Sequence, residues 1–151
     1  MTVDALHGLR MMRVDTALDD FGTGFSSLTS IEKLPLSRVK LDRSVIAAAD
    51  SNPRSAAIVH SMIGLCRNLG LHVTIEGVER LAQLDFLAAC GDVSIQGFLV
   101  GAPVEESEVV RRVHGTGDRL ESLLHAAALE RTDTLEDDLT SSVRMLRRNR
   151  R

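Results

Sequence analysis

The stretch Arg38-Val39-Lys40-Leu41-Asp42 alternates apolar and charged side chains, which is the pattern of a β-strand whose two faces have different surroundings. Residues 14–19, 71–76 and 93–98 repeat this alternation, each with its polar side chains on one face. A doubly wound parallel sheet is apolar on both faces, whereas a barrel has charged side chains pointing inward at the carboxyl ends of its strands. The pattern therefore favours strands of a βα barrel.

Helical stretches separate these strands, which predicts parallel βαβ units. We expect helices at residues 25–33, 53–69, 80–90 and 105–113. The longest has Asn52 as its N-cap, Pro53 at its first position and Gly70 as its stop. Its expected buried stripe consists of Ile58, Met62, Leu65 and Leu69. An eight-stranded βα barrel takes about 250 residues, so four βα units make only half of one.

Composition excludes several classes of protein. The 151 residues are 44% hydrophobic and 26% charged, which is typical of a folded globular chain. A net charge of −3 argues against binding to nucleic acid polymers, and no apolar run approaches the roughly 20 residues of a membrane span. The N-terminus lacks the pattern of a signal peptide, so we expect a cytoplasmic protein. We expect Cys66 and Cys90 to be buried free thiols.

Two carboxylates end the first predicted strand, in the run Asp19-Asp20-Phe21-Gly22-Thr23-Gly24. Paired carboxylates suit hard divalent cations such as Mg²⁺ or Mn²⁺. Because neighbouring residues of a strand point in opposite directions, both side chains can reach one ion only if the chain kinks at Asp20. Asp residues before glycines are also typical of turns and N-caps, so this run alone leaves both interpretations open.

Other polar side chains lie near the ends of the remaining predicted strands: Lys40, Glu76, Glu79 and Gln96. A lysine on the inner face near a phosphodiester can stabilise negative charge or orient an attacking water. Glu76 could bind a metal and Glu79 could hold a neighbouring loop. Each of two residues has an alternative interpretation. Lys40 could form an ordinary Lys–Asp ion pair, and the Gln96 amide could bond to backbone groups of a loop.

Taken in order, these motifs resemble the EAL-type cyclic di-GMP phosphodiesterase family. The motifs are DDFGTGFSSL at 19–28, LP-x(4)-KLDRS at 34–44, IEGVE at 75–79 and QGF at 96–98. The resemblance covers residues 9 to 103 and implies an α/β fold, the C-terminal half of a TIM-like (β/α)8 EAL barrel. It also implies a hydrolase that uses two Mg²⁺ or Mn²⁺ ions to activate a water and cut cyclic di-GMP to a linear dinucleotide.

The resemblance assigns a role to each candidate residue. By similarity, the metal ligands are Asp19, Asp20 and Glu76, and the catalytic residues are Lys40, Glu79 and Gln96. Lys40 resembles the lysine that orients the water. Glu79 resembles the glutamate that anchors the loop at residues 21–27, which is implicated in dimerisation. Ile75 departs from the family, where a small residue usually precedes the first glutamate, and residues 92–96 make a stretch one residue longer than usual.

The main departure lies before Asp19, where no Glu-x-Leu signature, asparagine ligand or further glutamate of the family is found. We therefore expect the isolated chain to be inactive, and to need a homodimer or another EAL-type protein to complete the site. The alternatives are an inactive EAL fragment that binds a protein or nucleotide as a regulatory module, and a truncated gene remnant. We expect a truncated EAL domain at residues 1–114 and a helical C-terminal tail at 115–151.

Overall fold

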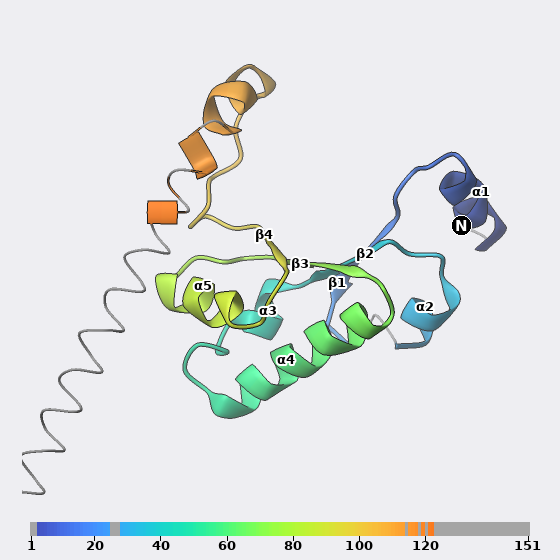
Figure 1. Ribbon diagram of the computed structural model, residues 1–151, viewed down its shortest axis with the longest axis horizontal. Helices are drawn as coiled ribbons and strands as arrows, with labels where there is room; N and C mark the ends of the chain where they lie inside the picture. The colour runs from blue at the N-terminus through green and yellow to red at the C-terminus, as the bar shows by residue number, and fades with distance from the viewer. Residues whose placement is uncertain (1–2, 25–27, 114, 118, 120, 123–151) are drawn as a thin grey trace, which may run out of the picture. The chain divides into compact units, whose positions relative to one another are not determined.

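The computed structural model describes residues 3–24, 28–113, 115–117, 119 and 121–122. It divides into two compact units, Met1–Pro103 and Val104–Arg151. The first unit alternates helices and strands along the chain (Figure 1). Its elements are α1 (Val3–Met11), β1 (Ala17–Phe21), α2 (Leu28–Lys33), β2 (Arg38–Leu41), α3 (Arg43–Ile46), α4 (Pro53–Asn68), β3 (His72–Ile75), α5 (Leu81–Ala88) and β4 (Ser94–Ile95).

The four strands form one parallel sheet in the order β1-β2-β3-β4. The register pairs Val39 with Val73 and Lys40 with Thr74. Because the strands are parallel and follow one another in space as in sequence, all their carboxyl ends lie at one edge of the sheet. The predicted α/β architecture with polar strand ends on one side of the sheet is confirmed.

All four strands differ in extent from the prediction, β2 and β3 by one residue at one or both ends and β1 and β4 by more. β1 begins at Ala17 rather than at residue 14. Just before it, the Thr16 amide donates to the Ser37 hydroxyl at 3.0 Å, and that hydroxyl donates to the Thr16 carbonyl at 2.9 Å. β4 contains only Ser94 and Ile95, because the chain turns immediately afterwards. In that turn the Gly97 carbonyl accepts from the amides of Val100 and Gly101. β1 ends two residues later than predicted, at Phe21, and β4 ends three residues earlier, at Ile95.

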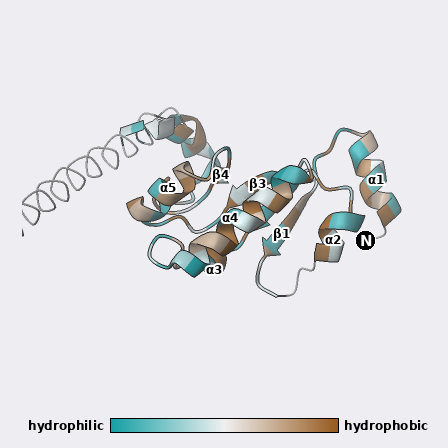
Figure 2. Cartoon of the chain, turned by 60° about the horizontal axis from the view of Figure 1, so that its bottom comes forward, coloured by the Kyte–Doolittle hydropathy of each residue, from teal (hydrophilic) through white to brown (hydrophobic). Residues whose placement is uncertain are grey.

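The core lies between the sheet and its helices. Val39, Leu41 and Ile75 are fully buried. In α4 the buried residues are Val59, Ile63 and Cys66, and Figure 2 shows apolar and hydrophilic positions mixed along this helix, as expected when one face packs on a sheet.

The predicted stripe of α4 is wrong. Ile58 and Leu69 are 51% and 52% exposed, and the buried row is Val59, Ile63 and Cys66, one position further along. Both rows have helical spacing and run side by side on the helix, so spacing alone does not decide which one meets the sheet.

Other local predictions are confirmed. The Asn52 side chain accepts from the amides of Arg54 and Ser55 at 2.9 and 3.3 Å, and Pro53 opens α4. Gly70 ends the helix with a φ of 71°, a conformation that suits glycine. Cys66 and Cys90 are free and buried, and burial raises the pKa of both thiols.

Two short helices were not predicted. α1 has apolar residues at Val3, Leu6 and Leu9, but it has only nine residues and buries none of them, so this short pattern was not interpreted as a helix. α3 has only four residues, and its start depends on Asp42, whose carboxylate accepts from the Ser44 amide at 2.9 Å.

The second unit is described only in part. Residues 106–113 are helical, close to the predicted 105–113. Most of the predicted helical tail at 115–151 lies outside the described residues, and the domain boundary after residue 114 stays a prediction. Among the helices that the structure describes, none has the length and apolar character needed to cross a membrane.

Candidate active site

A β-bulge places both aspartates at one point of the sheet. Leu18 pairs with Val39 and Phe21 with Leu41, so β1 has two residues, Asp19 and Asp20, where β2 has only Lys40. Asp20 has a φ of 52°, in the left-handed region that Asp tolerates better than most residues. This is the kink that both side chains need in order to face one site.

Three carboxylates converge at the bulge. One ligand oxygen from each of Asp19, Asp20 and Glu76 lies within 4.8 Å of the other two. The Lys40 ammonium lies between β1 and β3 and donates to Asp19 Oδ1 at 2.9 Å, and it also forms an ion pair with Glu76 Oε1. Four of the six candidate residues are therefore brought together by the carboxyl ends of three neighbouring strands.

The charges in this group shift one another's protonation. The hydrogen bond from Lys40 is the main reason that the pKa of Asp19 lies below its ordinary value. The hydrogen bonds to Asp19 and then Glu76 raise the pKa of Lys40. The side chain of Asp19 is 62% exposed and those of Lys40 and Glu76 are 25% and 20% exposed, so the group is open to solvent and ligand. Lys40 is charged and the carboxylate of Asp19 is ionised at neutral pH.

The three carboxylates fit a hard divalent cation. Carboxylate oxygens bind Mg²⁺ at about 2.0–2.1 Å, so two ligands of one ion lie at most about 4.2 Å apart. The observed spread of up to 4.8 Å needs only small side-chain rotations, which are available to the exposed Asp19 and Asp20. Asp19, Asp20 and Glu76 are the residues that would hold the ion.

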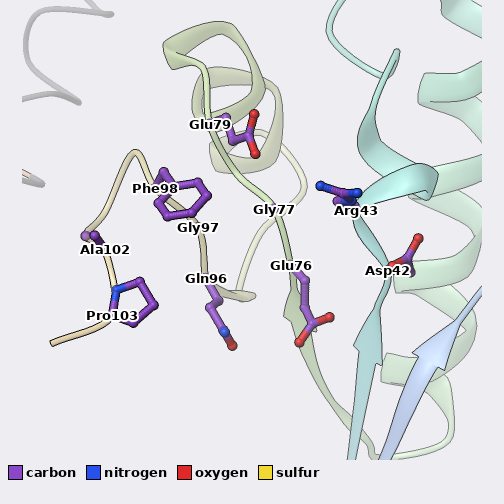
Figure 3. A pocket seen from close by; sticks show the side chains of 11 residues that line it. Asp42, Arg43, Glu76, Gly77, Glu79, Gln96, Gly97, Phe98, Ala102 and Pro103 are labelled. Atoms are coloured by element: carbon purple, nitrogen blue, oxygen red, sulfur yellow. The ribbon is translucent and has the colours of Figure 1, made fainter. Parts of the chain in front are cut away.

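A cleft of about 490 Å³ begins at Glu76 and extends over the ends of β3 and β4. In Figure 3 the side chains of Glu76 and Gln96 point to the same side, whereas Glu79 lies further along the loop. The lining residues are Asp42, Arg43, Glu76, Gly77, Glu79, Gln96, Gly97, Phe98, Gly101, Ala102 and Pro103. Gln96 therefore shares a cavity with Glu76.

The loop at 21–27, which Glu79 is expected to anchor, is described only at residues 21–24. No hydrogen bond or ion pair joins the Glu79 side chain to residues 21–24, and residues 25–27 of that loop lie outside the described part of the chain. The backbone of Glu79 is nevertheless fixed, because its amide donates to Gln83 Oε1 at 3.0 Å. The anchoring role of Glu79 stays a prediction.

Sequence reasoning did not single out several residues of the cleft. Arg43 and Phe98 supply a guanidinium group and a ring that is 67% exposed. Both lie within motifs quoted above, Arg43 in KLDRS and Phe98 in QGF, so membership of these motifs was the available signal.

Known proteins share this fold and these motifs. A model of the EAL domain matches residues 1–103. The bifunctional diguanylate cyclase/cyclic di-GMP phosphodiesterase MucR of Pseudomonas aeruginosa is 42% identical over 108 residues, which are 72% of this chain and 16% of MucR. The cyclic di-GMP phosphodiesterase RocR of the same organism is 35% identical over 115 residues, 76% of this chain and 29% of RocR.

Solved structures agree in fold. A MucR phosphodiesterase complex with cyclic di-GMP has a TM-score of 0.64 and 41% identity, covering 71% of this chain and 43% of that one. The EAL domain of Mycobacterium smegmatis DcpA has a TM-score of 0.68 and 37% identity, covering 72% and 51%. Klebsiella pneumoniae BlrP1, solved with manganese and cyclic di-GMP, has a TM-score of 0.61 and 33% identity, covering 66% and 26%.

This chain matches only a part of each relative's sequence. The chain spans between 12% and 29% of the length of the first five curated relatives that it matches. The parallel sheet of this chain thus corresponds to part of the TIM-like barrel of the EAL structures. Since the family model matches more than half of its residues, this chain belongs to the EAL domain family and is related to cyclic di-GMP phosphodiesterases.

Proposed function

We propose that this chain supplies one half of a metal-dependent site for the hydrolysis of cyclic di-GMP to a linear dinucleotide. The observation that carries the proposal is the convergence of the ligand oxygens of Asp19, Asp20 and Glu76 within 4.8 Å, beside the Lys40 ammonium. MucR, RocR and BlrP1 support the choice of substrate, because their names or titles give cyclic di-GMP as substrate or ligand.

The reaction adds one water across a phosphodiester bond. The water oxygen bonds to phosphorus, the bond from phosphorus to a sugar oxygen breaks, and that oxygen takes up a proton. A divalent cation such as Mg²⁺ or Mn²⁺, held by Asp19, Asp20 and Glu76, would supply Lewis acidity and a more acidic bound water when present. Three carboxylates carry one negative charge more than such a cation neutralises, and the Lys40 ammonium compensates this excess, so that an anionic phosphodiester is not repelled.

Lys40 and Gln96 have separate tasks in this proposal. Lys40 carries its proton at neutral pH, since Asp19 and Glu76 raise its pKa. Its N–H groups can therefore orient the attacking water and stabilise negative charge on the phosphoryl oxygens, but they cannot act as the base. Gln96 lines the cleft next to Glu76, where its amide can bond a phosphate oxygen or the water.

Further ligands would come from additional strands of an EAL barrel. A hard cation takes about six oxygens, and three carboxylates supply only part of that number. β1 and β4 lie at the two edges of the described sheet, and their outer backbone groups are available for pairing with more strands. We propose that these strands come from a second copy of the chain or from another EAL-type protein.

The test is hydrolysis of cyclic di-GMP by the purified chain with Mn²⁺, beside the Lys40→Ala variant, with the oligomer size measured by light scattering. The proposal expects turnover that is lost with a chelator and in Lys40→Ala, and that increases with protein concentration if a second copy completes the site. A folded wild-type chain that binds neither Mn²⁺ nor cyclic di-GMP at any concentration would refute it.

One observation favours a second candidate function, a regulatory module that binds a nucleotide or protein without cutting it. Lys40 already gives Asp19 and Glu76 a cationic partner, so the group is stable without a metal ion. This candidate expects binding of cyclic di-GMP or a protein partner without hydrolysis, unchanged in Lys40→Ala. The same pair of measurements therefore separates the two functions.

A further inference from the structure

The loop between β3 and α5, residues 76–80, carries Glu76 and Glu79 and forms one wall of the cleft. Gln83 of α5 lies against this loop and is only 3% exposed. Its Oε1 accepts hydrogen bonds from the backbone amides of Glu79 and Arg80, each at 3.0 Å. One buried amide oxygen thus satisfies two consecutive N–H groups where the loop turns into the helix.

The other end of the Gln83 amide contacts a different element. Its Nε2 donates to the carbonyl of Ile46, the last residue of α3, at 3.5 Å. A buried side-chain amide is costly unless both of its ends are bonded, so the position of α3 and the path of the loop are set together. Gln83 therefore links the loop to the segment that directly follows β2.

Arg80 adds a second link between the same two segments. Its Nε and Nη2 donate to the two carboxylate oxygens of Asp50 at 3.0 and 2.9 Å, and Nη2 also donates to the Ala47 carbonyl at 2.9 Å. The Asp50 side chain is only 9% exposed. Two parallel N–H···O bonds fix direction as well as distance, so this pair resists rotation of the loop.

The sheet fixes the opposite end of the loop. The Glu76 amide donates to the Leu41 carbonyl at 3.0 Å, and the Val78 amide donates to the Gln96 carbonyl at 3.1 Å. The backbone between Glu76 and Arg80 is thus held by β2 and β4 at its start and by Gln83 and Arg80 at its end. Neither carboxylate of the loop has a hydrogen bond with Gln83 or Asp50, so both remain directed elsewhere.

We infer that Gln83, supported by the Arg80–Asp50 pair, is a positioning residue that holds Glu76 and Glu79 at the cleft. The inference rests on the proposed function in one respect, the role of Glu76 as a metal ligand. Residues that orient metal ligands from behind typically change metal affinity by about 10- to 100-fold when they are replaced. Gln83 contacts no ligand oxygen and acts only through the backbone.

The test compares Gln83→Leu and Gln83→Glu with the wild-type chain. Mn²⁺ affinity is measured by titration followed by electron paramagnetic resonance, and hydrogen exchange is measured over residues 76–80. Gln83→Leu removes the acceptor and should weaken Mn²⁺ binding about tenfold and speed exchange at Glu79 and Arg80. Gln83→Glu keeps an acceptor oxygen and should restore the affinity to within about threefold of wild type.

A core variant is the matched control for simple loss of stability. Ile63→Val in α4 should lower the unfolding temperature without changing Mn²⁺ affinity or exchange at residues 76–80, because Ile63 lies in the core away from the loop. If Gln83→Leu does not fold, Asp50→Asn takes its place, since it weakens the Arg80 link and leaves Gln83 intact. It should weaken Mn²⁺ binding in the same direction.

Equal Mn²⁺ affinity and equal exchange in the wild-type chain and Gln83→Leu would overturn the inference. Failure of the proposed function looks different, because the wild-type chain would then bind no Mn²⁺. In that case the exchange measurement alone decides whether Gln83 holds the loop. Unchanged protection at Glu79 and Arg80 counts against it, and lost protection supports it.

Discussion

The Lys40 ammonium nitrogen lies 2.9 Å from Oδ1 of Asp19, across the boundary between β2 and β1. The Lys40 ammonium thus pairs with Asp19 and Glu76, two of the carboxylates that would also bind a metal ion. Two unit charges about 4 Å apart in water interact by about 1 kcal/mol, so a lysine beside a cation site lowers metal affinity. In the proposed function Lys40 is placed to bind the phosphodiester and the attacking water, and this position lowers the affinity of the site for the metal ion.

Replacement of Lys40 should therefore separate metal binding from turnover. We predict that Lys40→Met tightens Mn²⁺ binding by at least about fivefold, from the loss of that repulsion, while it abolishes any hydrolysis of cyclic di-GMP. Mn²⁺ titration and product analysis measure the two effects. Arg38→Met is the control, because Arg38 lies on the same strand but bonds to Thr74 Oγ1, and it should change Mn²⁺ affinity less. Weaker Mn²⁺ binding in Lys40→Met would contradict the prediction.

Asp20 has two roles that substitution can distinguish. Its φ of 52° disfavours residues with a Cβ, whereas its carboxylate belongs to the candidate metal group. We predict that Asp20→Gly is more stable than Asp20→Ala by about 1 kcal/mol, because glycine adopts this conformation without strain. Both variants should lose Mn²⁺ affinity, since neither has a carboxylate.

Urea unfolding and Mn²⁺ titration check this pair of variants. Ala17→Gly, on the same strand with ordinary extended backbone, is the control and should be less stable than wild type by about 0.5–1 kcal/mol. An Asp20→Ala variant as stable as Asp20→Gly would show that the bulge has a different conformation at residue 20.

The sequence was sufficient to predict the four parallel strands and to bring Asp19, Asp20, Lys40 and Glu76 to one edge of the sheet, because both depend on alternation and strand order. The alternation at Lys40 assigned its side chain to the polar face, and the need for both aspartates to face one ion predicted the kink at Asp20. α1 was not predicted, since its nine residues give too short a run of apolar positions to indicate a helix, and none of them is buried. The role of Gln83 depends partly on its contact with the Ile46 carbonyl. Ile46 lies 37 residues earlier in the chain, so spacing along the sequence does not reveal this contact.

The pair between Arg80 and Asp50 should make stability depend on pH. The hydrogen bond from Arg80 is the main reason that the pKa of Asp50 lies below its ordinary value. A carboxylate whose pKa is lowered by folding stabilises the native state above its unfolded pKa, about 3.9, and loses that contribution as pH falls through the lower folded value. We predict that the difference in urea midpoint between wild type and Arg80→Met is constant between about pH 6 and 8 and shrinks below about pH 4.

Arg111→Met is the control for this pH series. Arg111 forms an exposed pair with Glu108 three residues earlier in the second unit, and such pairs contribute little. Its urea midpoint should follow wild type at every pH. A difference for Arg80→Met that stays the same at pH 3 would mean that the Ala47 carbonyl, rather than the Asp50 carboxylate, is the important partner of Arg80.

Gly97 packs so closely against the backbone of Val78 that a single added methyl group should lower the stability of the fold. A Cβ added there would lie 2.2 Å from the carbonyl oxygen of Val78, a backbone atom that is itself bonded to the Leu99 amide and has no room to move. We predict that Gly97→Ala destabilises the fold by about 3 kcal/mol, at the upper end for overpacking, and reduces binding of cyclic di-GMP. Gly101→Ala is the control, because Gly101 lines the same cleft but an added Cβ would meet nothing within 4 Å. Thermal unfolding of the two variants measures the difference, and equal unfolding temperatures would mean that the loop after β3 and the turn after β4 are not packed together as described.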